Sequence, residues 1–180
     1  MKSADVTLVP MKKDDREQFI LDNQRAFKFG AVEEFGMRDN HFEEDGEIIS
    51  RKTIEASIDD EGAETYRIVE SGKNVGGVIL KIDADTRRGE LVLFFVAPQE
   101  HSRGVGFAAW QEIEKLHPET KVWETCTPYF DKRNLHFYIN KCGFHAVEFC
   151  CAFHHDPRGT DECSDGEEND GMFRFEKVMM

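Results

Sequence analysis

The chain has 180 residues, 39% of them hydrophobic, and its 15 phenylalanines are enough to build a core. Its formal net charge of −13 argues against nucleic acid or an anionic membrane as the main partner and favours a cationic small molecule. No stretch approaches the roughly 20 apolar residues of a membrane span, and the first ten residues lack the apolar core of a signal peptide. Five cysteines without paired spacing are typical of a reducing compartment, so we expect a cytoplasmic protein. The length of the chain predicts one domain over residues 1–180.

Two helices are predicted in the first third of the chain, after a short strand at residues 6–9. The first runs from Asp14 to about Phe29, with Asp14 or Asp15 as its N-cap and Gly30 at its end. Its buried side would hold Phe19, Ile20 and Ala26. The second runs over residues 50–58, beyond an acidic stretch at residues 31–48 that has no clean period.

The remaining pattern predicts a series of strands. A hairpin is expected at residues 65–70 and 75–82 around a polar turn, and a second polar turn leads to a central strand that begins near residue 89. Further strands are predicted at residues 121–125, 144–154 and 172–178, with a helix over about 129–142 that ends at Gly143. Consecutive antiparallel strands followed by helices favour an α+β class over an alternating parallel one.

The central strand and the helix that follows it form the most informative stretch, residues 91–118. The apolar run Leu91–Val96 predicts a buried strand, closed by Pro98. Gly104 and Gly106 then precede a helical pattern that Pro118 stops. That helix would bury one face, made of Phe107, Trp110, Ile113 and Leu116. A strand, a glycine turn and a helix point free backbone N–H groups at one spot, which favours a phosphate, although the same glycines also suit a plain tight turn.

Two motifs resemble those of the GNAT superfamily of N-acetyltransferases. The family's pyrophosphate motif, Arg/Gln-x-x-Gly-x-Gly/Ala after a strand that ends in Val-x-Pro, is matched by residues 96–98 and 104–106, while His101 replaces the Arg or Gln. Residues 137–144 resemble the second family signature through Tyr138, Gly143 and Phe144.

This resemblance implies a fold and a reaction. The expected fold is α+β and GNAT-like, with a mixed, mostly antiparallel central sheet of six to seven strands flanked by about four helices. The expected reaction moves the acetyl group of acetyl-CoA to a primary amine of a small cationic acceptor. The residues expected to bind the cofactor are Phe95, Val96, His101, Ser102, Arg103, Gly104, Val105, Gly106 and Asn134. Asp131 stands where many relatives have Asn, so which of Asp131 and Asn134 reaches the cofactor stays open.

The chemistry of acetyl transfer assigns further roles. A lysine-like amine has a pKa near ~10.4 and must lose a proton. The resemblance implies Glu90 as the candidate base, because members of the family often carry a Glu on this strand that acts directly or through water. Glu90 is equally compatible with a plain exposed residue at a strand end. A backbone amide near Phe95 or Val96 would stabilise the tetrahedral oxyanion, and Tyr138 would protonate the departing thiolate.

Other readings stay open. The acids at residues 33–45 and in the acidic flexible loop 155–171 would attract an amine, or they are solvated faces only. His154, His155, Asp156 and Cys163 match no zinc signature, so no metal is expected.

A catalytically silent acyl-CoA-binding or protein-interaction module is the main alternative. A phosphoryl-transfer enzyme is the weakest reading because the glycine turn lacks a P-loop lysine. A homodimer stays possible.

Overall fold

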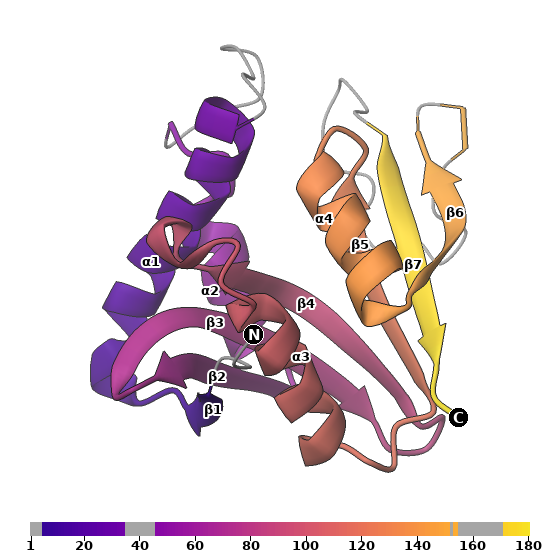
Figure 1. Cartoon of the computed structure of the whole chain (residues 1–180), viewed down its shortest axis with the longest axis horizontal. Coiled ribbons are helices and arrows are strands. Elements are labelled where there is room, and N and C mark those ends of the chain that lie inside the picture. Colours follow the sequence, from indigo (N-terminus) through magenta and orange to yellow (C-terminus); the bar gives the residue numbers. More distant parts are fainter. Residues whose placement is uncertain (1–4, 35–45, 152, 155–170) are drawn as a thin grey trace. The chain divides into compact units, whose positions relative to one another are not determined.

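A computed structural model describes residues 5–34, 46–151, 153–154 and 171–180. The chain divides into two compact units (Figure 1). The first unit contains the residues up to Ile82 together with Leu91–Glu119, and the second contains Asp83–Glu90 and Thr120–Met180. The expectation of a single domain over residues 1–180 stays a prediction.

The first unit holds a sheet with the strand order β1-β2-β3-β4. The strands are β1 Val6–Pro10, β2 Ala63–Glu70, β3 Lys73–Asp83 and β4 Arg88–Val96, of which β4 begins in the second unit. β1 pairs antiparallel with β2, and β2 pairs antiparallel with β3. The helices are α1 Arg16–Lys28, α2 Arg51–Asp59 and α3 Val105–Leu116. The predicted strands and helices of this region are therefore present, with ends shifted by a few residues.

The helices of the first unit bury two faces of its sheet. One core cluster joins α1 and α2 to the strands and contains Phe19, Ile20, Ala26, Ile54, Ile79, Leu93 and Phe95. The other joins α3 to the strands and contains Val6, Ile68, Val75, Val105, Ala108 and Ala109. Phe94 and Val96 pack against this second cluster, so the alternating side chains of β4 serve both faces.

Two details of the helix predictions were wrong, and a third was right in part. Asp15, one of the two predicted residues, is the N-cap of α1, but it makes no side-chain cap bond and its carboxylate binds Arg67. Gly30 does not end the helical path, which continues as a π-helical segment over Phe29–Glu34. On α3 the predicted positions Phe107 and Leu116 are exposed. The predicted residues Trp110 and Ile113 are buried. Three smaller residues, which let α3 approach the sheet, are buried with them: Val105, Ala108 and Ala109.

The second unit contains three strands in the order β5-β7-β6. These are β5 Val122–Pro128, β6 His145–Cys150 and β7 Met172–Val178, and β7 pairs antiparallel with both neighbours. The predicted helix over 129–142 is made of α4, Lys132–His136, and a π-helical segment, Phe137–Cys142. Gly143 has φ +78° and ends this segment, as predicted. Within the π-helical segment, Tyr138 is buried, whereas Ile139 is 43% exposed.

Charged side chains line one face of these strands. Arg88 pairs with Glu124 and with Glu176 (2.7 Å), and Arg174 pairs with Glu176 (2.8 Å) and Glu148 (2.9 Å). Hydrogen bonds from His154 and Arg174 hold the pKa of the Glu148 carboxyl below its ordinary value. Glu124 and Glu176 lie directly opposite each other on β5 and β7, and the arginines beside them offset the repulsion between the two carboxylates.

Among the described helices, none has both the length and the apolar character that crossing a membrane requires.

Candidate active site

The turn between β4 and α3 exposes backbone donors at the start of a helix. Gly104 has φ +82° and precedes α3, whose first helical bond joins the Ala108 N–H to the Gly104 carbonyl (3.0 Å). The N–H groups of residues 105–107 consequently have no partner within the helix, and the helix dipole adds positive potential there. A Cβ at Gly104 would meet no heavy atom within 4 Å, so open space lies beside this residue. This arrangement is suited to binding a phosphate.

The His101 side chain connects the turn to the last residue of β4. Its Nε2 lies 2.9 Å from the Val96 carbonyl oxygen, and its ring meets the Phe29 ring edge-on at 5.6 Å. The imidazole thus has a structural role within the turn, and the predicted phosphate contact at this position would come from the backbone.

The two residues after His101 are exposed. Ser102 has φ +66°, an uncommon conformation for a residue with a side chain. Arg103 pairs with Glu100 and lies 3.8 Å from Glu70. The predicted binding residues from Phe95 to Gly106 therefore lie together in the first unit, at and beyond the end of β4.

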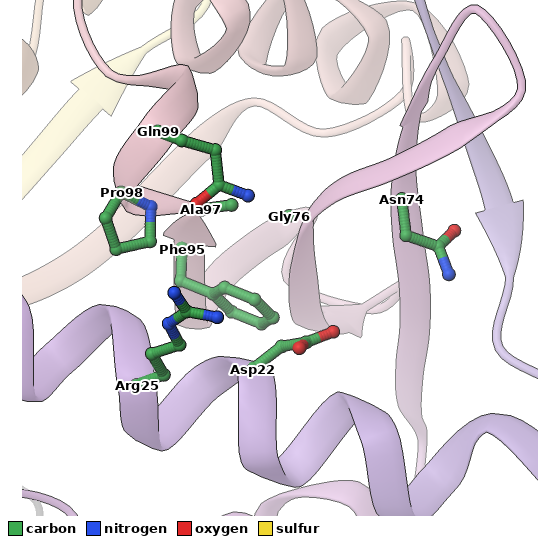
Figure 2. Close-up of a pocket in the computed structure, with 8 residues that line it drawn as sticks. All are labelled: Asp22, Arg25, Asn74, Gly76, Phe95, Ala97, Pro98 and Gln99. Carbon is green, nitrogen blue, oxygen red and sulfur yellow. The ribbon is translucent and has the colours of Figure 1, made fainter.

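A small cavity of about 60 Å³ lies beside the end of β4 (Figure 2). It shares three of its lining residues with a larger open groove of about 520 Å³. The cavity is lined by Asp22, Arg25, Asn74, Gly76, Phe95, Ala97, Pro98 and Gln99, and the groove by Arg25, Lys28, Phe29, Pro98 and Gln99. Of these residues, only Phe95 was predicted as a binding residue, although Ala97 and Pro98 were part of the motif that pointed to the cofactor. The spacing of Asp22, Arg25 and Phe29, which places them on one face of a helix, is the signal that could have found the α1 residues.

Tyr138 lies in the core of the second unit, where it is 5% exposed. Its ring contacts those of Phe144 (5.6 Å) and Phe175 (5.9 Å). Burial raises the pKa of the Tyr138 hydroxyl well above its ordinary value of 10.0, and a hydrogen bond with Thr125 opposes this effect without cancelling it. The phenol therefore stays protonated at neutral pH.

The two candidates at the start of α4 have different local roles. The Asp131 carboxylate accepts a hydrogen bond from the Asn134 N–H (2.9 Å), so Asp131 is the N-cap of α4. The Asn134 side chain donates to the Thr127 hydroxyl at 3.4 Å. Glu90, the candidate base, is half-buried on the part of β4 that belongs to the second unit.

The remaining predicted features fall largely outside the described residues. These include residues 35–45 and 155–170, and with them most of the acids expected to attract an amine. Of the four residues considered as metal ligands, only His154 is described, and it binds Glu148 (2.9 Å). Within the described ranges, no group of three His, Cys, Asp or Glu side chains could hold a metal ion.

Comparisons with known proteins agree on one family. The profile of the acetyltransferase (GNAT) family matches residues 22–144. The uncharacterised protein YrkN of Bacillus subtilis is 42% identical over 97% of this chain and 94% of its own length.

Solved structures show the same fold at low identity. The PaiA N-acetyltransferase of Thermoplasma acidophilum, solved with coenzyme A, has a TM-score of 0.67 at 17% identity and covers 97% of this chain and 99% of its own. The spermidine N-acetyltransferase of Vibrio cholerae, solved with CoA and spermine, has a TM-score of 0.65 at 13% identity and covers 96% of this chain and 95% of its own. These similarities confirm the predicted fold class, an α+β GNAT fold with seven strands and four α-helices in the described chain.

Proposed function

This chain belongs to the acetyltransferase (GNAT) family, and we propose that it moves the acetyl group of acetyl-CoA to a primary amine of a small cationic acceptor. The observation that carries the proposal is the glycine turn before α3, where helix N–H groups and open space at Gly104 suit a diphosphate.

Cofactor binding follows from this turn. The diphosphate would accept hydrogen bonds from the N–H groups of residues 105–107, with residues 101–104 around it. A backbone amide near Phe95 or Val96 would stabilise the oxyanion that forms on the acetyl carbonyl. Asn134 is proposed as a further contact of the cofactor. No residue of this set requires a metal.

The acid–base steps are assigned to Glu90 and Tyr138. Glu90, directly or through a water molecule, would take a proton from the ammonium form of the acceptor, because only the neutral amine can attack the thioester carbon. The amine nitrogen then forms a bond to that carbon, the carbon–sulfur bond breaks, and the nitrogen releases its surplus proton to water as the amide forms. Tyr138 would give its proton to the departing thiolate, a role that its protonated state at neutral pH supports.

The net charge of the chain supports a cationic acceptor. At −13, the protein raises the local concentration of cations through its long-range field. The polyamine named for the Vibrio cholerae structure is an amine of this kind.

Calorimetry and a thiol-release assay test the proposal together. We expect acetyl-CoA to bind in calorimetry, and we expect a panel of primary amines to include acceptors that release free CoA thiol. Acetyl-CoA binding without turnover on any amine would favour the silent acyl-CoA-binding module, and absence of binding would refute both readings.

A further inference from the structure

The cavity beside β4 is lined by apolar residues and by a set of four polar residues, the polar rim. Phe95, Ala97 and Pro98 supply apolar surface, and Gly76 adds a stretch of bare backbone. The rim carries Asp22 and Arg25 from α1, Asn74 from β3 and Gln99 from the turn after β4 (Figure 2). Residues as far apart in the sequence as Asp22 and Gln99, which are 77 positions apart, thus meet around one small space.

The rim offers hydrogen-bond donors more readily than acceptors. Arg25, Asn74 and Gln99 carry N–H groups, and their side chains make no hydrogen bond or ion pair within the described part of the chain. Asp22 is already engaged, since its carboxylate accepts from Arg67 (2.8 Å) and from Gln18 (2.8 Å). A group that enters the cavity therefore meets one guanidinium and two amides whose N–H groups are not taken up by any described residue.

The adjoining groove adds a second positive charge. Lys28 lies one turn after Arg25 on α1 and lines the groove, where it also lies 3.4 Å from Glu47. Phe29 and Pro98 give the groove apolar surface for a short aliphatic chain. A cationic rim over apolar walls suits a small molecule with an anionic end and a hydrocarbon stem.

We propose that Arg25 binds a carboxylate of the acceptor, so that the acceptor is an amino acid with a second, side-chain amine and not a simple polyamine. This inference rests on the proposed function, because it names the substrate class of the same site. A guanidinium matches a carboxylate with two parallel hydrogen bonds, and the amides of Gln99 and Asn74 can supply further donors.

The position of the cavity favours the acceptor over the cofactor as the source of the anion. Phe95, which lines the cavity, packs in the cluster formed by α1 and α2, whereas α3 packs in the other cluster. The anion site for the cofactor diphosphate is at the N-terminus of α3. A carboxylate at Arg25 would therefore be bound on the α1 side of β4, next to the backbone proposed to hold the acetyl carbonyl.

A diamino acid also agrees with the charge of the chain. Two ammonium groups and one carboxylate leave a net charge of +1, so the field of a protein with charge −13 still attracts the molecule. The carboxylate then decides its orientation, which places the side-chain amine away from Arg25.

Two matched substrate pairs test the proposal. Lysine and cadaverine differ only in the carboxylate, as do ornithine and putrescine. We expect the wild-type protein to have a kcat/KM roughly tenfold or more higher for the amino acid of each pair. Arg25→Gln should remove this preference by raising the KM for the amino acids, while the KM for acetyl-CoA stays unchanged. The diamines, which have no carboxylate to lose, should be used at least as well as by the wild type, because a like charge is removed from their site. Arg16→Gln removes the same charge from the same helix away from the cavity and should leave the preference intact.

A binding measurement keeps the test independent of turnover. The Arg25 Nε–Hε resonance, identified by its loss in Arg25→Gln, should shift when the CoA-bound protein is titrated with lysine and stay in place with cadaverine. A shift without thiol release from any amine would leave the carboxylate site standing and refute the proposed function.

Three results would overturn the carboxylate site. The first is equal use of both members of each substrate pair by the wild type. The second is an Arg25 resonance that does not respond to lysine. The third is an Arg25→Gln variant that changes the KM for acetyl-CoA but not for the amino acids, since the anion would then belong to the cofactor.

Discussion

Tyr138 combines deep burial with a hydroxyl that stays protonated, and both features follow from its place among Phe144, Phe175 and Thr125. We predict that Tyr138→Phe keeps this packing and lowers the rate of acetyl transfer by roughly 10²-fold or more, because the thiolate loses its proton donor. The affinity for acetyl-CoA should hold. Single-turnover kinetics separate chemistry from product release, and an unchanged single-turnover rate would refute the assignment.

Tyr138 should also make the stability of the protein depend on pH in the alkaline range. Burial raises the pKa of the Tyr138 hydroxyl above 10.0, so the folded chain keeps a proton that the unfolded chain releases. The free energy of unfolding should therefore be unaffected by this group below pH 10 and fall above it, by up to about 1.4 kcal/mol per pH unit.

Urea unfolding at pH 8 and pH 11 measures this effect. The loss of stability between the two pH values should be smaller in Tyr138→Phe than in the wild type, and an equal loss would contradict the prediction. Tyr66, whose pKa burial and a hydrogen bond to Glu64 raise to about 12, should still contribute in both proteins.

Arg67 is a buried charged residue of the first unit. Its side chain is 3% exposed, binds Asp15 and Asp22, and lies over the Phe19 ring at 5.1 Å. We predict that Arg67→Ala costs about 3–5 kcal/mol of unfolding free energy, because it leaves a cavity and two carboxylates without their partner.

An exposed arginine provides the control for Arg67. Arg51 pairs with Glu17 at the surface, where their side chains are 40% and 62% exposed. Arg51→Ala should cost about 0–1 kcal/mol, and similar losses for the two arginines in chemical unfolding would show that burial does not set the strength of the Arg67 contacts.

At the scale of the elements, the start of α3 depends on a backbone conformation that only glycine adopts easily. Gly104 has φ +82°, and open space lies where its side chain would be. We predict that Gly104→Val abolishes acetyl-CoA binding in calorimetry, because the isopropyl group fills the space beside the helix N–H groups.

Gly72 is a close match for Gly104. It has φ +77° and equally open surroundings, but it lies in the turn between β2 and β3. Gly72→Val should therefore lose a similar amount of stability, on the order of 1–2 kcal/mol, and bind acetyl-CoA normally. Loss of binding in both variants would mean that backbone strain, and not the filled space, is the cause.

At the scale of the whole molecule, the excess of acids should act on capture of the acceptor. Exposed charges act over about 8–10 Å at physiological salt, so they change the encounter of the acceptor with the protein more than the rate of the chemical step. We predict that the double change Glu167→Gln with Glu168→Gln raises the acceptor KM, by about twofold at low salt, with kcat little changed and a weaker dependence on salt.

A second double variant, with the same change of net charge at other positions, separates the effect of the acids at 167 and 168 from the effect of the total charge. Glu61→Gln with Asp85→Asn removes two exposed acids and the same net charge. If both double variants raise KM equally, the total charge governs capture, and the segment at 155–171 has no special role. Steady-state kinetics at low and at physiological salt distinguish these outcomes.

The sequence by itself determined the features that depend on a few neighbouring residues. The last strand was predicted over residues 172–178, and β7 has these ends, Met172–Val178. The glycines at 104 and 143 marked a helix start and a helix end, and both adopt positive φ values. Such features can be read locally because backbone preference and side-chain period are properties of short segments.

Only the tertiary structure decided which distant side chains meet. Asp15 was predicted to cap its own helix, yet it binds Arg67, which lies fifty-two positions later on β2. Arg25 and Gln99 line one cavity although no local pattern connects them. Contacts of this kind depend on how α1 and the strands bury their apolar faces together, so their geometry arises from packing of the whole unit and not from any one segment.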